Sequence, residues 1–274
     1  MNPGFFVVVT ALLYMFATAL QMGTNAARLA GVRTNRIATG LTLFNVFGTT
    51  GRFLNLFYLP LIGSLADKAG AAHDPAQFDL DMRWVMGAAT LGIVLGGALV
   101  PWASRTLVRG IGSFEQRGSL LHAIAQLLRP RVLLSVLRDF ELPRPSMLAY
   151  SPRNLPKGFL IWNIVVIAFW VAGPLAAYYA GVLEPNYRLT AASLSGLITG
   201  ISTLTLTYIV DPTSALITDQ TAHCLRPESD IKAMILWLVG TAFIGTLVAQ
   251  LLLVPAADII AVAAKVVNNA HIHL

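Results

Sequence analysis

Residues 158–182 read GFLIWNIVVIAFWVAGPLAAYYAGV and contain no charged side chain. A helix needs about 20 mostly apolar residues to cross roughly 30 Å of hydrocarbon, so this run is long enough to span a membrane. The rest of the chain has the same character. Of 274 residues, 56% are hydrophobic and 12% are charged, whereas soluble domains average about 25% charged residues. The composition excludes a disordered chain and predicts a polytopic membrane protein.

Five further apolar stretches flank this run, which gives six predicted transmembrane helices in one all-α domain covering residues 1–274. They lie at about 3–22, 37–66, 82–104, 158–182, 189–210 and 233–264. The first stretch lacks a basic leading segment and a small-residue cleavage site, so we interpret it as a retained helix and not as a signal peptide. Cys224 is the only cysteine, which excludes a disulfide-stapled secreted domain.

The basic residues are distributed unevenly between the predicted loops. Fourteen of the 19 lysines and arginines fall in the first, third and fifth loops. Because basic loops stay on the cytoplasmic side, this asymmetry predicts that both termini lie outside. The net charge of +6 is therefore interpreted as a topology signal, and no nucleic-acid partner is expected.

The third loop, residues 105–157, is the only large segment outside the predicted spans. Leucines recur at helical spacing from Leu120 to Leu137, but Arg129 and Arg131 would each cost about 2.5–3.5 kcal/mol at the centre of a span. We expect amphipathic helices on the inner leaflet, with arginines contacting anionic lipids at about 1 kcal/mol each. The alternative is a linker that only carries topogenic charge.

A polar stripe follows one face of the second predicted span. At 100° per residue, Asn45, Thr49 and Arg52 lie within about 60° of one another, with Asn55 at the edge of the stripe. An arginine facing lipid is unfavourable. Arg52 is therefore expected either to pair with an acidic residue of another helix or to face a cavity that receives an anion. The candidates for a counter-ion or coupling residue are Asp211, Asp219 and Asp258.

Two further features bear on the shape of the spans. The second span is longer than a straight crossing needs, which either unwinding at Gly48–Gly51 or a simple tilt would explain. Asp211 is followed by a proline, which predicts that the fifth span ends or breaks there.

Small and hydroxyl residues are spaced for helix packing in two spans. Glycines three residues apart let backbones approach, which we expect at Gly92-x3-Gly96 and Gly196-x3-Gly200. The fifth span also carries a hydroxyl at every fourth residue, which either packs or lines a hydrated groove: Ser195, Thr199, Thr203 and Thr207.

The sequence lacks the common signatures of catalysis. It contains no phosphate-binding loop of the ATPase type, no paired-cysteine or H-E-x-x-H zinc motif, and no base placed beside a nucleophile within a triad. We expect no metal, no cofactor and no catalytic residue. This favours transport, although an intramembrane enzyme stays an alternative.

The segment RLAGVRTNRIATGLTLFNVFGTTGRFLNLFYLPLIGSLAD, residues 28–67, and the motif Val210-Asp211-Pro212 resemble the Amj family of lipid II flippases. The resemblance implies a multi-pass protein of the bacterial cytoplasmic membrane. Such proteins move an undecaprenyl-pyrophosphate-linked disaccharide-pentapeptide, lipid II, to the outer leaflet for peptidoglycan synthesis.

This implied function suggests roles for the polar residues. Arg52, Asn45, Thr49 and Asn55 are candidates for binding the pyrophosphate within the membrane. Arg28, Arg33 and Arg36 are candidates for collecting the head group at the cytoplasmic mouth, and they are also topogenic charges. Three alternatives remain: a transporter of a water-soluble anion, an enzyme acting on polyprenyl phosphates, and a non-catalytic partner of wall synthesis. The sequence gives neither the oligomeric state nor the coupling ion.

Overall fold

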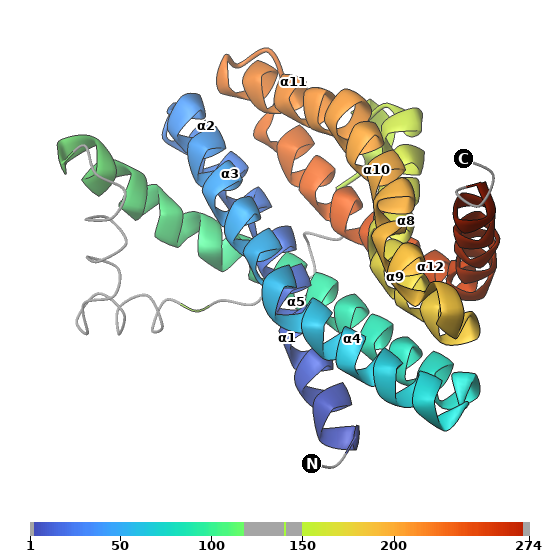
Figure 1. Cartoon of the computed structure of the whole chain (residues 1–274). Coiled ribbons are helices and arrows are strands. Elements are labelled where there is room, and N and C mark those ends of the chain that lie inside the picture. Colours follow the sequence, from blue (N-terminus) through green and yellow to red (C-terminus); the bar gives the residue numbers. More distant parts are fainter. Residues whose placement is uncertain (1–2, 118–139, 141–149, 271–274) are drawn as a thin grey trace.

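In the computed structural model, the described residues are 3–117, 140 and 150–270, and all regular elements within these ranges are helical. This confirms the all-α prediction. The helices group into six legs that run back and forth past one another (Figure 1). In chain order the legs are α1 (Pro3–Gly23) with α2 (Asn25–Arg33); α3 (Ile37–Phe53) with α4 (Asn55–Ala72); α5 (Pro75–Arg117); α8 (Lys157–Leu183); α9 (Arg188–Ser193), α10 (Ser195–Thr205), the π-helix η4 (Leu206–Val210) and α11 (Asp211–Ala222); and α12 (Glu228–Ala270). Two short 3-10 turns, η2 (Pro152–Asn154) and η3 (Pro185–Tyr187), precede the fourth and fifth legs.

Left-handed residues separate three of the legs from the next. Asn35, His73 and Cys224 have φ angles of 55°, 54° and 58°. A residue in this conformation commonly terminates a helix, and Asn tolerates it better than most. The resulting turns are short, so consecutive legs run antiparallel and lie side by side.

Glycines set the closest approaches between legs. A Cβ atom at Gly92 would clash with the Met15 carbonyl and the Thr18 hydroxyl, and one at Gly96 would clash with the Ala19 carbonyl. The predicted packing role of this glycine pair is therefore confirmed, and it joins α5 to α1.

The second glycine pair was predicted wrongly. No atom comes within 4 Å of a Cβ placed at Gly196 or Gly200. On the same leg, the Thr199 and Thr203 hydroxyls donate to the carbonyls of Ser195 and Thr199, four residues earlier, so these two bond within their own helix. Ser202, which no pattern indicated, is the hydroxyl that reaches across, donating to the Val166 carbonyl of α8 at 2.7 Å.

Five stretches are long and apolar enough to cross a membrane: Gly4–Arg33, Pro75–Gly112, Lys157–Leu183, Pro185–Ala222 and Glu228–Asn269. The predicted span 37–66 is not among them. There the chain forms two helices, α3 of 17 residues and α4 of 18 residues, on either side of Leu54. The third predicted span ends later than expected, since α5 continues to Arg117. The amphipathic helices predicted from Leu120 to Leu137 lie outside the described residues.

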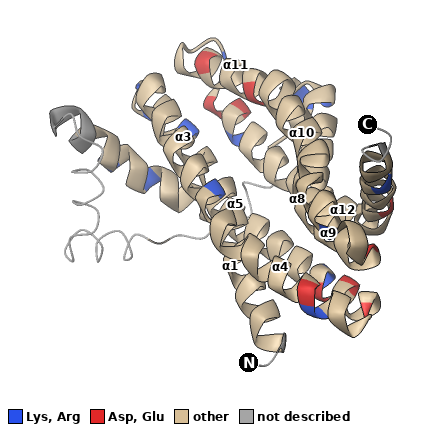
Figure 2. Cartoon of the chain, in the orientation of Figure 1, with Lys and Arg blue, Asp and Glu red and all other residues tan. Residues whose placement is uncertain are grey.

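Charged side chains gather at two ends of the bundle (Figure 2). At one end, Arg33 Nε pairs with Glu228 at 3.0 Å, and Arg226 pairs with Asp230 at 3.5 Å. At the other end, Arg188 pairs with Asp67 at 3.1 Å. The segment between these ends is mostly apolar, and the polar residues found there form the site described next.

Candidate functional site

A cavity of about 120 Å³ lies between the first two legs on one side and the fourth and fifth legs on the other. It brings together five of the ten predicted site residues: Arg28, Asn45, Thr49, Arg52 and Asp211. Its wall includes residues of α1, α2, α3, α8, η4, α11 and α12. The polar and charged lining residues are Gln21, Thr24, Asn25, Arg28, Asn45, Thr49, Arg52, Asn163, Asp211 and Ser214.

The polar stripe of α3 forms the exposed side of this cavity. Asn45, Thr49 and Arg52 all line it, and all three residues are exposed. Within the described ranges, Arg52 makes no hydrogen bond or ion pair, so its guanidinium faces the cavity without a protein counter-ion. Of the two roles considered for Arg52, the structure matches the cavity-facing one.

The backbone near Arg52 differs from the predicted break. Helix α3 is continuous through Gly48–Gly51, so unwinding at that point was wrong. The interruption comes at Leu54, two residues after Arg52, and α4 begins at Asn55. Arg52 lies in the last turn of α3, where a cation interacts favourably with the negative end of the helix dipole.

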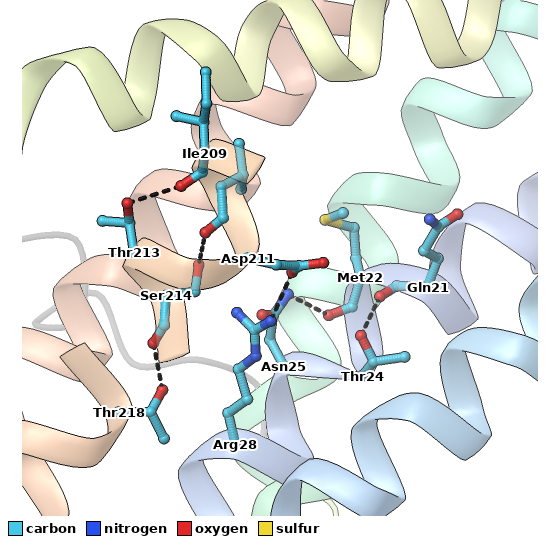
Figure 3. A network of polar contacts seen from close by, with 11 residues as sticks. Gln21, Met22, Thr24, Asn25, Arg28, Ile209, Asp211, Thr213, Ser214 and Thr218 are labelled. Atoms are coloured by element: carbon cyan, nitrogen blue, oxygen red, sulfur yellow. Dashed lines mark hydrogen bonds and ion pairs between the residues drawn. The ribbon is translucent and has the colours of Figure 1, made fainter. Parts of the chain in front are cut away.

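Arg28 of α2 and Asp211 of α11 also line the cavity and point toward one another (Figure 3). Arg28 Nη2 donates to Asp211 Oδ1 at 2.9 Å; the Arg28 side chain is 4% exposed and that of Asp211 is 41% exposed. The guanidinium carbon also lies 3.9 Å from the centre of the Phe44 ring, a cation–π contact. Arg28 was expected at the mouth as a collector of head groups; it is instead buried in an ion pair, with its Nε atom lacking a partner.

A π-helical turn directly precedes Asp211 in the chain. Residues Leu206–Val210 form the π-helix, and α11 continues from Asp211 to Ala222. Of the two outcomes predicted at Asp211-Pro212, the helix does not end there, but its regular α-helical geometry is broken by the π-helix just before Asp211. A π turn absorbs an extra residue, and Pro212 sits in the first turn of α11, where its missing N–H costs little. Asp219, expected in a loop, lies within α11.

The other predicted site residues do not line the cavity. Arg33 pairs with Glu228 and donates to Ser104 Oγ at 3.3 Å. Asp219 lies 3.4 Å from the His223 ring, and Asp258 is exposed on α12. Arg36 and Asn55 are also absent from its lining, and none of the three aspartates pairs with Arg52.

Sequence reasoning missed two lining residues on the far wall. Asn163 Nδ2 donates to the Leu238 carbonyl at 3.1 Å and to Thr241 Oγ1 at 2.8 Å, tying α8 to α12. Ser214 Oγ donates to the Val210 carbonyl at 2.8 Å. Asn163 is the one amide side chain in the apolar run 158–182, and this could have indicated from the sequence that it has a polar partner within the bundle.

The charges that line the cavity sum to one positive charge, from Arg28, Arg52 and Asp211. In a medium of low dielectric constant, such a surplus favours an anion, and a guanidinium beside amides and a hydroxyl offers charge-assisted hydrogen bonds to phosphate oxygens. No group of three or more His, Cys, Asp and Glu within the described residues could hold a metal ion.

Five membrane-length stretches, with a cavity between the legs that carries a surplus positive charge, define the class as a multi-pass membrane protein. The comparisons with known proteins give the family. A family model described as "Alternate to MurJ" matches residues 13–264, and the chain therefore belongs to the Amj family. The chain is 31% identical over 265 residues to a Bacillus subtilis (strain 168) protein named "Lipid II flippase Amj", a match covering 93% of this chain and 97% of that protein. No solved structure matches the chain.

Proposed function

We propose that this protein is a lipid II flippase, which carries the undecaprenyl-pyrophosphate-linked peptidoglycan precursor from the inner to the outer leaflet of the cytoplasmic membrane. The observation that carries the proposal is the cavity lined by Arg52, Asn45 and Thr49, in which Arg52 has no counter-ion among the described residues, in a member of the Amj family. The pyrophosphate of lipid II is negatively charged and joined directly to the lipid chain, and a charged group is unfavourable in hydrocarbon unless a cation accompanies it.

The size of the cavity limits what it holds in the described state. Small-molecule pockets occupy roughly 300–1,000 Å³, whereas this cavity has about 120 Å³. It accommodates a phosphate-sized group but not a disaccharide-pentapeptide. Passage of the whole head group therefore requires the two walls to separate. The Arg28–Asp211 pair, which bridges α2 and α11, is the polar contact that must loosen.

The proposed topology has six crossings with both termini outside, the second leg crossing as the pair α3 and α4. The ion pairs support it. Residues of the first, third and fifth predicted loops meet at one end, as in Arg33–Glu228 and the hydrogen bond from Asn154 to Asp230. Residues of the second and fourth predicted loops meet each other or the segment after the sixth span at the other end, as in Arg188–Asp67 and Lys265–Glu184. Arg153 of the third predicted loop then lies on the cytoplasmic side, where anionic lipids attract it.

The protein acts as a transporter without chemistry of its own. The sequence carries no ATPase motif, so the proposed driving force is an ion gradient, the membrane potential or consumption of lipid II outside. Substrate binding is assigned to Arg52, Asn45 and Thr49, and Asp211 is proposed to respond to the substrate by releasing Arg28.

The test is translocation of labelled lipid II between the leaflets of liposomes that contain the purified protein, with protein-free liposomes as control. Translocation above the control supports the proposal. Its absence with and without an imposed ion gradient contradicts it, and uptake of a soluble anion under those conditions would identify the alternative transporter.

A further inference from the structure

A second hollow, here called the apolar groove, lies between α1 and α5 beside the polar cavity. It has a volume of about 540 Å³, and its lining contains no charged residue. Met15 to Thr24 form one wall and Leu95 to Leu107 form the other, with Phe47 of α3 contributing to it. Small residues such as Ala19, Ala98 and Ala103 leave the space unfilled.

The groove opens away from the bundle. Phe16 is 59% exposed and Leu95 is 49% exposed, and both line it. Both walls belong to stretches that are long and apolar enough to cross a membrane. An apolar hollow at that level contacts lipid chains and not water, so its natural occupant is a hydrocarbon chain.

The groove and the polar cavity adjoin. Thr24, at the junction of α1 and α2, lines both. On α3, Phe44 lines the cavity and Phe47, one turn later, lines the groove. The Thr24 hydroxyl donates to the Gln21 carbonyl at 2.6 Å, which satisfies the polar group at the boundary. A cationic cavity thus meets an uncharged groove at a single shared residue.

We infer that the groove holds the isoprenoid units next to the pyrophosphate of a polyprenyl-linked substrate while the pyrophosphate occupies the polar cavity. This inference rests on the proposed function and adds to it a site for the lipid chain. A molecule that joins a pyrophosphate directly to a hydrocarbon chain needs a cationic and an apolar surface in contact, and these two hollows provide them. A water-soluble anion would use the cavity alone.

Photo-crosslinking tests where the chain lies. The probe is a polyprenyl pyrophosphate with a diazirine on its first isoprenoid units, added to the full-length protein in liposomes. We expect labelled peptides from residues 15–24 and 95–107, and we expect excess unlabelled polyprenyl pyrophosphate to suppress the labelling while excess phosphatidylglycerol does not. Equal suppression by phosphatidylglycerol, or labelling spread over exposed positions such as Leu251 and Val262, would overturn the inference in favour of ordinary lipid contact.

A substitution that fills the groove gives the second measurement. Ala98→Phe adds a ring within it and should slow lipid II translocation and reduce crosslinking by about tenfold, a typical overpacking penalty. Val94→Phe is the matched control, because Val94 lies on the same helix, is 45% exposed and does not line the groove. If Ala98→Phe lowers the yield of folded protein, Ala103→Phe replaces it.

The outcomes separate this inference from the proposed function. In one outcome, the wild type translocates lipid II, Ala98→Phe does so at the same rate, and the crosslinks fall outside the groove. This would overturn the groove as the site of the lipid chain and leave the proposed flippase function standing. In the other outcome, the wild type does not translocate lipid II, but the probe crosslinks in the groove and only the polyprenyl competitor suppresses this. This would overturn the proposed flippase function and leave the groove as a binding site for the lipid chain.

Discussion

Arg28 and Asp211 lie 183 positions apart in the chain, yet a 2.9 Å hydrogen bond joins them beside the cavity. A nearly buried guanidinium is stabilised only while it keeps its partner, since an unpaired charge in a low-dielectric site is costly. Arg52 shows the opposite arrangement, an exposed cation facing the cavity without an acid among the described residues. The two arginines therefore have different roles: Arg28 holds two legs together, and Arg52 is available to a ligand.

This difference predicts how stability responds to substitution. Asp211→Leu leaves Arg28 unpaired and should lower the free energy of unfolding by about 1–3 kcal/mol, less than for a fully buried pair because Asp211 is 41% exposed. The double variant Arg28→Leu with Asp211→Leu should recover part of that loss. Thermal unfolding in detergent measures both, and Asp219→Leu on the same helix is the control. A double variant less stable than the single one would refute the structural role of the pair.

At the scale of helices, two irregular turns shape the cavity. The interruption at Leu54 follows the polar stripe of α3, and the π-helix Leu206–Val210 precedes Asp211. Facing them, α1 and α5 pack through Gly92 and Gly96 with backbone nearly touching backbone. The irregular helices α3 and η4 thus line the cavity, while α1 and α5 form a closely packed pair.

The glycine contact gives a prediction for the helix pair. The Cβ atom of Gly92→Leu would clash with the Met15 carbonyl, so the substitution must push α1 away from α5. We therefore expect loss of folded protein. Gly87→Leu on the same helix meets no atom within 4 Å and should be tolerated. Size-exclusion profiles and melting temperatures in detergent distinguish the two. Equal behaviour of both variants would rule out a packing role for Gly92.

Sequence periodicity predicted local features better than pairings. The stripe Asn45, Thr49 and Arg52 followed from helical geometry alone, and the structure places all three on the cavity. The pairing of Arg28 with Asp211 could not be predicted from helical geometry, because it depends on the first and fifth legs being neighbours. The same pattern of spaced glycines packed at Gly92 and Gly96 but met open space at Gly196 and Gly200, since small residues permit close contact and do not create it. Pro212 predicted an end or a break of the helix, and the structure shows a break, the π-helix, after which the helix continues.

At the scale of the whole molecule, charged side chains gather at two ends of the bundle (Figure 2). The six legs alternate in direction, so contacts such as Arg33–Glu228 and Arg188–Asp67 fall at opposite ends. Opposite ends of a membrane-spanning bundle face opposite compartments. The polar cavity and the apolar groove both lie between these ends. A lipid with a charged head group and a hydrocarbon chain needs one surface of each kind.

The single cysteine makes the orientation measurable. Cys224 is exposed in the turn between α11 and α12, which the proposed topology puts in the cytoplasm. In intact cells it should react with a membrane-permeant maleimide and not with an impermeant one. A Cys224→Ser, His73→Cys variant, with its thiol in the exposed turn after α4, should react with both reagents. The reverse pattern would invert the topology.

The most direct test of the account is the rate of lipid II translocation in liposomes by Arg52→Leu compared with the wild type and with Arg153→Leu. Arg153 is an exposed arginine outside the cavity, so the same change there is the matched control. If the pyrophosphate binds at Arg52, Arg52→Leu should be inserted and folded but inactive, while Arg153→Leu keeps the wild-type rate. Translocation by Arg52→Leu at the wild-type rate would contradict the claim that this cavity receives the substrate.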